Sequence, residues 1–206
     1  DMLRGAHLGD INSQSYQEYA SDIHKSGQHL LGLIDDVLDI SAIEAGKRVL
    51  QKEKVDVKDL LDDCFRSFLP QAKENKINIS YTIADAVQHI YADLRSVKQI
   101  ILNLVSNAVK FTENNGEIAV SVKKADEYTI IEVRDTGVGI PAETLLHITE
   151  PFTQGHANPM LSQKGYGLGL SIVKQLVMVH DGTVKLQSEV GTGTTAIVVL
   201  PDGVPD

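Results

Sequence analysis

One uninterrupted helical stretch, residues 15–45, limits what this chain can fold into more than any other feature. The stretch has no proline, and its apolar residues recur at heptad spacing in a broad stripe: Tyr16, Tyr19, Ile23, Leu30, Leu31, Leu33, Ile34, Val37, Leu38 and Ile40. A helix of about 30 residues with so wide an apolar face is not stable alone in water. The stretch therefore predicts one helix of a four-helix bundle, whose other helices would bury this face.

After Gly46 the pattern changes to alternating strands and helices. Apolar and polar residues alternate in residues 77–83, which is the period of a half-buried strand. Similar patterns predict strands at 49–57, 117–124, 128–135, 182–188 and 194–200, and helices at 57–75, 93–112 and 168–180. Pro70 is expected to interrupt the first of these helices. The predicted fold class is α+β, a two-layer α/β sandwich with a mixed sheet preceded by a long stalk helix, with domains at 1–47 and 48–206.

The composition excludes several functions. The 206 residues carry a formal net charge of −9 and show no basic cluster, which argues against binding to nucleic acid or to an anionic membrane. A single cysteine, Cys64, cannot form an internal disulfide and fits a reducing, cytoplasmic compartment. No membrane-spanning run or signal peptide is visible. Because the chain begins at Asp1, we expect it to be a piece of a longer protein, which would meet a membrane only through segments absent here.

Polar residues form a second stripe on the helix predicted at 93–112. Gln99, Asn103, Asn107 and Lys110 follow at steps of four, four and three, so they share one side of the helix. This stripe is either a solvated face or a surface that meets a polyphosphate and its metal ion. In the second case, the amide oxygens would suit Mg²⁺, and the Lys110 ammonium would contact phosphate.

Three glycine-rich segments follow. Asp135 ends a predicted strand, and Gly137 and Gly139 let the backbone turn tightly, so that the Asp135 carboxylate could accept a hydrogen bond from an exocyclic amine. Glycines at 165, 167 and 169 open a helix whose first N–H groups favour anions, behind a lid-like stretch at 155–164. Residues 191–195 connect the last two strands. Each segment alone is equally consistent with an ordinary turn or loop.

The order of these segments is far more specific than any one of them. The motifs are NLVSNAVKFT at 103–112, DTGVG at 135–139, EPFTQ at 150–154, GYGLGL at 165–170 and GTGT at 191–194. In this order and spacing they resemble the five nucleotide-binding boxes of sensor histidine kinases. Residues 33–46 resemble the second helix of that family's dimerisation and phosphotransfer domain. The resemblance covers nearly the whole chain.

The resemblance implies a Bergerat ATP-binding fold with ATP and Mg²⁺ as cofactors. Asn107 would be the principal Mg²⁺ ligand with Asn103 assisting, Asp135 would bind the adenine amine, and Phe152 would anchor the lid. The implied nucleotide-binding set is Asn103, Asn107, Lys110, Phe111, Asp135, Gly137, Gly139, Ile140, Phe152, Lys164, Gly165, Tyr166, Gly167, Leu168, Gly169, Leu170 and Thr194. The implied partners are a second copy of the chain, joined through the stalk helices, and the receiver domain of a response regulator.

Two departures from the family pattern stand out. The phospho-acceptor box, His-Glu/Asp-Leu-Arg-x-Pro, has no match, since His24 and His29 lie in other contexts. We therefore expect no catalytic residue of that box here, an acceptor histidine upstream of Asp1, and no autophosphorylation of this piece alone. Thr149 also stands where many relatives have an aromatic residue.

Two other classes of function remain as alternatives, which are other ATP-using enzymes and a non-catalytic scaffold. ATPases of the same superfamily use a Glu where this chain has Asn103, because hydrolysis needs a general base for water. A protein-serine kinase of the anti-sigma type would lack the stalk helix. The other class is a pseudokinase scaffold that binds partners without catalysis, which the missing acceptor box leaves open.

Overall fold

The structure, a computed structural model, describes residues 14–44, 49–153 and 167–203. The chain divides into two compact units, Asp1–Asp39 and Ile40–Asp206. The predicted domain boundary after residue 47 remains a prediction. No helix in the described part is long and apolar enough to cross a membrane.

The predicted long helix is present as α1, Gln14–Glu44. Within the chain its apolar stripe is largely uncovered, and the large exposed side chains on it are Tyr19, Ile23, Leu30, Leu31, Ile34, Val37 and Leu38. An apolar surface of this size on one helix marks an interaction face rather than a solvated one.

A five-stranded mixed sheet forms the base of the larger unit. Its strands lie in the order β2 (Asn78–Ile83), β4 (Glu117–Ala125), β5 (Tyr128–Asp135), β7 (Gly193–Pro201) and β6 (Thr183–Glu189). The β2–β4 pair is parallel and the others are antiparallel. Alternate residues point into the core, and the buried ones include Ile118, Val120, Ile131, Val133, Val198 and Leu200. The predicted two-layer sandwich with a mixed sheet is confirmed.

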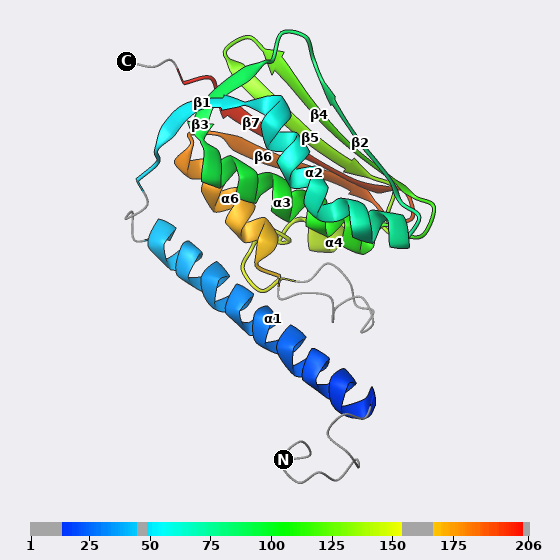
Figure 1. Cartoon of the computed structure of the whole chain (residues 1–206). Coiled ribbons are helices and arrows are strands. Elements are labelled where there is room, and N and C mark those ends of the chain that lie inside the picture. The colour runs from blue at the N-terminus through cyan, green and yellow to red at the C-terminus, as the bar shows by residue number, and fades with distance from the viewer. Residues whose placement is uncertain (1–13, 45–48, 154–166, 204–206) are drawn as a thin grey trace. The chain divides into compact units, whose positions relative to one another are not determined.

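Helices α2 (Val57–Glu74), α3 (Leu94–Phe111) and α6 (Gly169–Val179) cover one face of this sheet (Figure 1). Helix α3 lies against α6 and buries Ile100, Ile101 and Val105 completely. Asp93 starts α3 as its N-cap, with its Oδ1 atom accepting a hydrogen bond from the Ser96 backbone N–H at 2.8 Å. A short helix, α4 (Ala142–Leu145), lies in the predicted loop region.

A small second sheet was not anticipated in full. β1 (Lys52–Asp56) pairs antiparallel with β3 (His89–Asp93), a strand that the sequence pattern did not reveal. The expected interruption at Pro70 is wrong, since α2 runs through it to Glu74. Pro70 is exposed, so the lost backbone hydrogen bond falls on the solvent side, while Phe65 and Ala72 keep the buried side of the helix packed.

A buried histidine joins the C-terminal end of α6 to the N-terminal end of α3. His180, which is 2% exposed, ends α6 and contacts the Leu176 carbonyl through Nδ1 at 2.7 Å. Its Nε2 accepts a hydrogen bond from the Asp93 backbone N–H at 3.3 Å. The C-terminus of α6 is thereby attached to the N-cap of α3, which helps to hold the two helices side by side.

Candidate functional site

The amide stripe of α3 meets the first residue of α6. Gln99, Asn103, Asn107 and Lys110 are all half-buried, as expected for one side of the helix. A methyl group on Gly169 would lie 3.5 Å from the Asn103 Oδ1 atom and 3.7 Å from the Asn107 Nδ2 atom. The Asn103 Nδ2 atom is buried and has no hydrogen-bond partner in the described structure. A buried amide without a partner is costly, so the Asn103 amide is suited to meet a polar ligand.

The start of α6 is held by the segment before the predicted lid. Gly167 has a positive φ of 74°, and its carbonyl accepts a hydrogen bond from the Phe152 backbone N–H at 3.0 Å. A side chain on Gly167 would lie 2.4 Å from the Thr153 carbonyl oxygen. Only glycine fits this close crossing, which brings the two borders of residues 154–166 together.

Several residues of the predicted nucleotide-binding set lie at the borders of residues 154–166. Leu168 is buried at 2% exposure, and Leu170 is half-buried beside it. Phe152 is 67% exposed, so its predicted role as the anchor of the lid remains a prediction. Lys164, Gly165 and Tyr166 lie outside the described residues.

Asp135 ends β5 with its carboxylate partly occupied. Its Oδ1 atom accepts hydrogen bonds from the Gly137 N–H at 2.8 Å and from the Thr194 N–H at 3.2 Å. Burial raises the pKa of Asp135, and the hydrogen bonds from Gly137 and Thr194 oppose this shift. Because Oδ1 already has two donors, Oδ2 is the oxygen suited to accept a hydrogen bond from a ligand.

The Asp135–Gly139 loop joins the end of α3 to the β6–β7 turn. The Phe111 carbonyl accepts a hydrogen bond from the Val138 N–H at 3.1 Å, and a side chain on Gly137 would lie 2.4 Å from that carbonyl oxygen. Gly139 has a positive φ of 70° and passes so close to Glu189 that a side chain would lie 2.0 Å from the Glu189 carbonyl oxygen. Both predicted glycines are therefore required by close backbone approach.

Lys110 and Phe111 interact at the end of α3. The Lys110 ammonium lies 4.7 Å from the centre of the Phe111 ring, in a cation–π arrangement. This contact holds a positive charge on the same side of α3 as Asn103 and Asn107.

A residue that the sequence reasoning missed, Ser188, links the loop to the last hairpin. Its hydroxyl accepts a hydrogen bond from the Ile140 N–H at 2.8 Å, lies 2.8 Å from the Thr194 Oγ1 atom, and donates to the Gly193 carbonyl at 2.9 Å. The alternation of residues 182–188 predicted only a strand there, and no local motif marks a serine of this kind.

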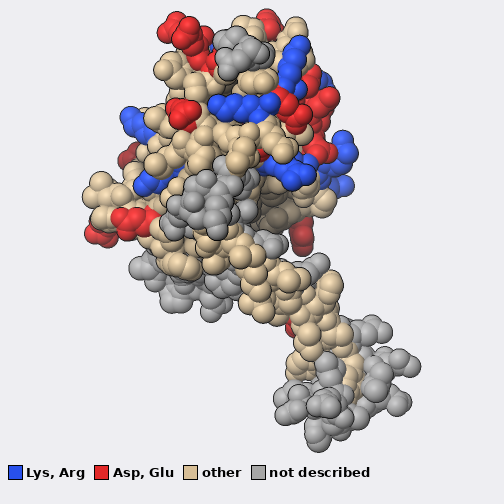
Figure 2. Space-filling model, turned by 90° about the vertical axis from the view of Figure 1, so that its left-hand side faces the viewer, with Lys and Arg blue, Asp and Glu red and all other residues tan. Residues whose placement is uncertain are grey.

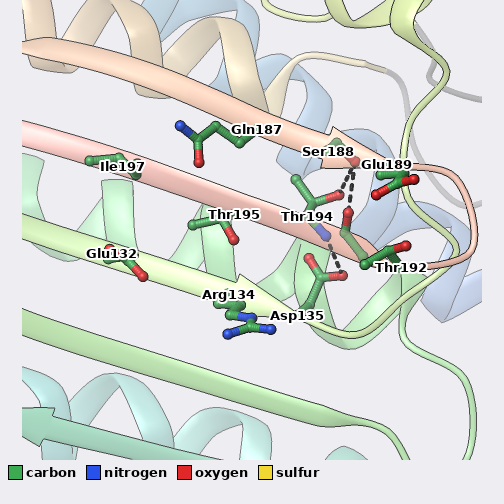
Figure 3. Close-up of a pocket in the computed structure, with 11 residues that line it drawn as sticks. Glu132, Arg134, Asp135, Gln187, Ser188, Glu189, Thr192, Thr194, Thr195 and Ile197 are labelled. Atoms are coloured by element: carbon green, nitrogen blue, oxygen red, sulfur yellow. Dashed lines mark hydrogen bonds between the residues drawn. The ribbon is translucent and has the colours of Figure 1, made fainter.

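A hollow on the open face of the sheet adjoins this hairpin (Figure 3). Asp135, Ser188 and Thr194 line one end of it, while Glu132, Arg134 and Gln187 belong to the sheet face opposite the helices. No residue of α3 or α6 lines this hollow. It is therefore distinct from the place where Asn103 and Asn107 meet Gly169.

The amides of Asn103 and Asn107 fit a hard cation held together with a ligand. Among the described residues, no three His, Cys, Asp or Glu side chains gather as a metal site. In the described part of the chain, the polar side-chain groups nearest to Gly169 are the amides of Asn103 and Asn107. Mg²⁺ uses few protein ligands and retains waters or phosphate oxygens, so one or two amide oxygens suffice.

On the face shown in Figure 2, basic side chains lie among acidic ones rather than in one patch.

Comparison with known proteins gives consistent findings. Residues 92–204 match the family described as histidine kinase-, DNA gyrase B-, and HSP90-like ATPase. The non-motile and phage-resistance protein of Caulobacter vibrioides is 38% identical over 205 residues, which are 98% of this chain and 24% of that protein. Histidine protein kinase DivJ of the same organism is 39% identical over 201 residues, 98% of this chain and 33% of that protein.

A solved structure agrees with these relatives. The crystal structure of full-length ShkA in complex with AMPPNP superposes with a TM-score of 0.81 at 30% identity, over 94% of this chain and 40% of that one. The present chain thus spans a quarter to a third of the two curated relatives, at 24% and 33% of their lengths.

The raised pKa of Asp135 leads to a prediction about stability. An acid whose pKa is higher in the folded than in the unfolded protein binds its proton more tightly when folded, so its contribution to stability improves as the pH falls. At pH 7 we expect Asp135→Asn, whose amide oxygen still accepts both N–H groups, to raise the free energy of unfolding, because it removes the buried charge. That gain should shrink as the pH falls from the raised pKa toward about 3.9, the ordinary Asp value. Urea denaturation at several pH values measures it, and a gain that grows on acidification would contradict the assignment.

Proposed function

Because this chain belongs to the sensor histidine kinases of the histidine kinase-, DNA gyrase B- and HSP90-like ATPase family, we propose that it binds Mg²⁺-ATP and supplies the γ-phosphoryl group to a histidine outside this sequence. The observation that carries the proposal is the place where the amides of Asn103 and Asn107 meet the first residue of α6, Gly169, with the Asn103 Nδ2 atom buried and without a partner in the described structure.

The adenine end of the nucleotide would lie at Asp135. Its Oδ1 atom is held by the Gly137 and Thr194 N–H groups, which leaves Oδ2 to accept a hydrogen bond from an exocyclic amine. The backbone crossings at Gly137 and Gly139 keep side chains out of the floor of the loop, so that a flat base can approach the backbone closely.

The phosphate end would lie between α3 and α6. The N-terminus of α6, which no side chain caps in the described structure, presents backbone N–H groups and the positive end of the helix dipole, which favour anions. Lys110 adds positive charge at the end of the same stripe, and Asn107 with Asn103 would hold Mg²⁺. Bound Mg²⁺ would neutralise charge on the phosphates. Phosphoryl transfer depends largely on such positioning and electrostatics.

Transfer to a histidine is favoured over hydrolysis by the residue at position 103. A general base that activates water needs a carboxylate or an imidazole, and Asn103 offers neither. A receiver domain of a response regulator would take the phosphoryl group from that histidine. The uncovered apolar stripe of α1 supports a homodimer, in which stalk helices from two copies bury it.

The amide stripe gives a direct prediction for binding. We expect Asn107→Ala to abolish Mg²⁺-dependent ATP binding, a loss of at least about 100-fold in affinity, because it removes the principal metal ligand. Its unfolding curve should stay close to that of the wild type, since Asn107 is half-buried and lies outside the core. Calorimetric titration with a non-hydrolysable ATP analogue measures the loss. Asn114→Ala, an exposed asparagine beyond the helix, is the matched control, and an unchanged affinity in Asn107→Ala would refute the site.

Phosphoryl transfer needs a separate experiment. A protein in which this chain is joined to a helix that carries an acceptor histidine should acquire acid-labile, alkali-stable phosphate from radiolabelled ATP, and this chain alone should acquire none. ATP binding without any transfer in that joined protein would instead support a scaffold that binds nucleotide but does not catalyse.

A further inference from the structure

Ser188, on β6, forms hydrogen bonds to Gly193 and Thr194 at the start of β7 (Figure 3) and also to Ile140 in the loop after Asp135. Its hydroxyl oxygen has three polar neighbours, which are the Ile140 N–H at 2.8 Å, the Gly193 carbonyl at 2.9 Å and the Thr194 hydroxyl at 2.8 Å. The site described above uses Thr194 but gives Ser188 no role of its own.

The identity of these neighbours fixes the direction of each hydrogen bond. The Ile140 N–H can only donate, and the Gly193 carbonyl can only accept. Ser188 has one hydroxyl hydrogen, and it is committed to the Gly193 carbonyl. In the remaining contact Thr194 must therefore be the donor and Ser188 the acceptor.

This direction determines what Thr194 can offer to a ligand. Once its hydrogen points at Ser188, the Thr194 hydroxyl presents only lone pairs elsewhere. Thr194 is paired with Asp135 across β7 and β5, and the Thr194 N–H donates to the Asp135 Oδ1 atom at 3.2 Å. Two acceptors, the Thr194 hydroxyl and the Asp135 Oδ2 atom, therefore belong to neighbouring residues at one end of the sheet.

We propose that Ser188 is a positioning residue that determines base specificity: by taking the hydrogen of Thr194 it makes this end of the site accept from an amino-purine and reject a keto-purine. The inference rests on the proposed function, because it assumes that the base lies beside Asp135. An exocyclic amine brings two hydrogens to these acceptors. A keto oxygen at the same position brings lone pairs against lone pairs, which leaves buried polar atoms unpaired.

The test compares ATP with ITP, which carries a keto oxygen in place of the adenine amine. We expect wild-type protein with Mg²⁺ to bind ATP at least about tenfold more tightly than ITP. In Ser188→Ala the Thr194 hydroxyl is free to rotate and donate to the keto oxygen. The ratio of the two dissociation constants should then fall by about fivefold. Equilibrium titration with each nucleotide gives the ratio.

Three further variants separate specificity from simple structural damage. Thr195→Val, on the same strand with its side chain on the open face of the sheet, should keep the wild-type ratio. Thr194→Val, which keeps Ser188 but removes the hydroxyl, should lower the ratio as well, and it serves if Ser188→Ala does not fold. In the Thr194→Val background, Ser188→Ala should change the ratio no further, since the two residues act through one hydroxyl.

The outcomes distinguish this inference from the proposed function. Wild-type binding of ATP with an equal loss of both nucleotides in Ser188→Ala would mean a structural role only, and would overturn the inference alone. A ratio that falls in Ser188→Ala even without the Thr194 hydroxyl would also overturn it. A wild-type protein that binds neither nucleotide would overturn the proposed function, and the inference with it.

Discussion

The packing of α3 against α6 on one face of the sheet is the contact on which the rest of the site depends. Helix α3 uses one side, including Ile100, Ile101 and Val105, to fill the core, and this leaves its amide stripe facing the start of α6. Away from this stripe, His180 at the C-terminal end of α6 accepts a hydrogen bond from the Asp93 N–H at the N-terminal end of α3, which ties these two ends together. The same burial that stabilises the fold thus sets the separation between Asn103 or Asn107 and Gly169, where phosphate and metal would lie.

The second half of the site is made by backbone rather than by helices. The loop after Asp135 passes so close to the Phe111 and Glu189 carbonyls that only glycine fits at positions 137 and 139. That closeness explains why the chain carries these glycines at fixed spacing. It also places the carboxylate of Asp135 beside the Thr194 N–H, so the adenine end of the proposed site is fixed by the pairing of β5 with β7.

Much of this arrangement could be predicted from sequence because its causes are local. The helical period of residues 93–112 placed Asn103 and Asn107 on a different side from the buried residues of α3. The alternation of residues 77–83 predicted both ends of β2 to within one residue. Strand β3 was missed because its five residues gain their stability from pairing with β1, which is a distant contact. Pro70 was misjudged because packing on the buried side of α2 outweighs one lost hydrogen bond. Ser188 could not be found because its importance arises only when Ile140, Gly193 and Thr194 are brought together in space.

The most direct measurement follows the side-chain and backbone amide NMR signals of the ¹⁵N-labelled chain during titration with Mg²⁺ and a non-hydrolysable ATP analogue. The account predicts saturable shifts for the Asn103 and Asn107 side-chain amides and for the backbone amides of Gly137 and Gly169, with the asparagine shifts requiring Mg²⁺. It would be contradicted by shifts confined to the open face of the sheet around Glu132, Arg134 and Gln187, or by no shifts at millimolar nucleotide.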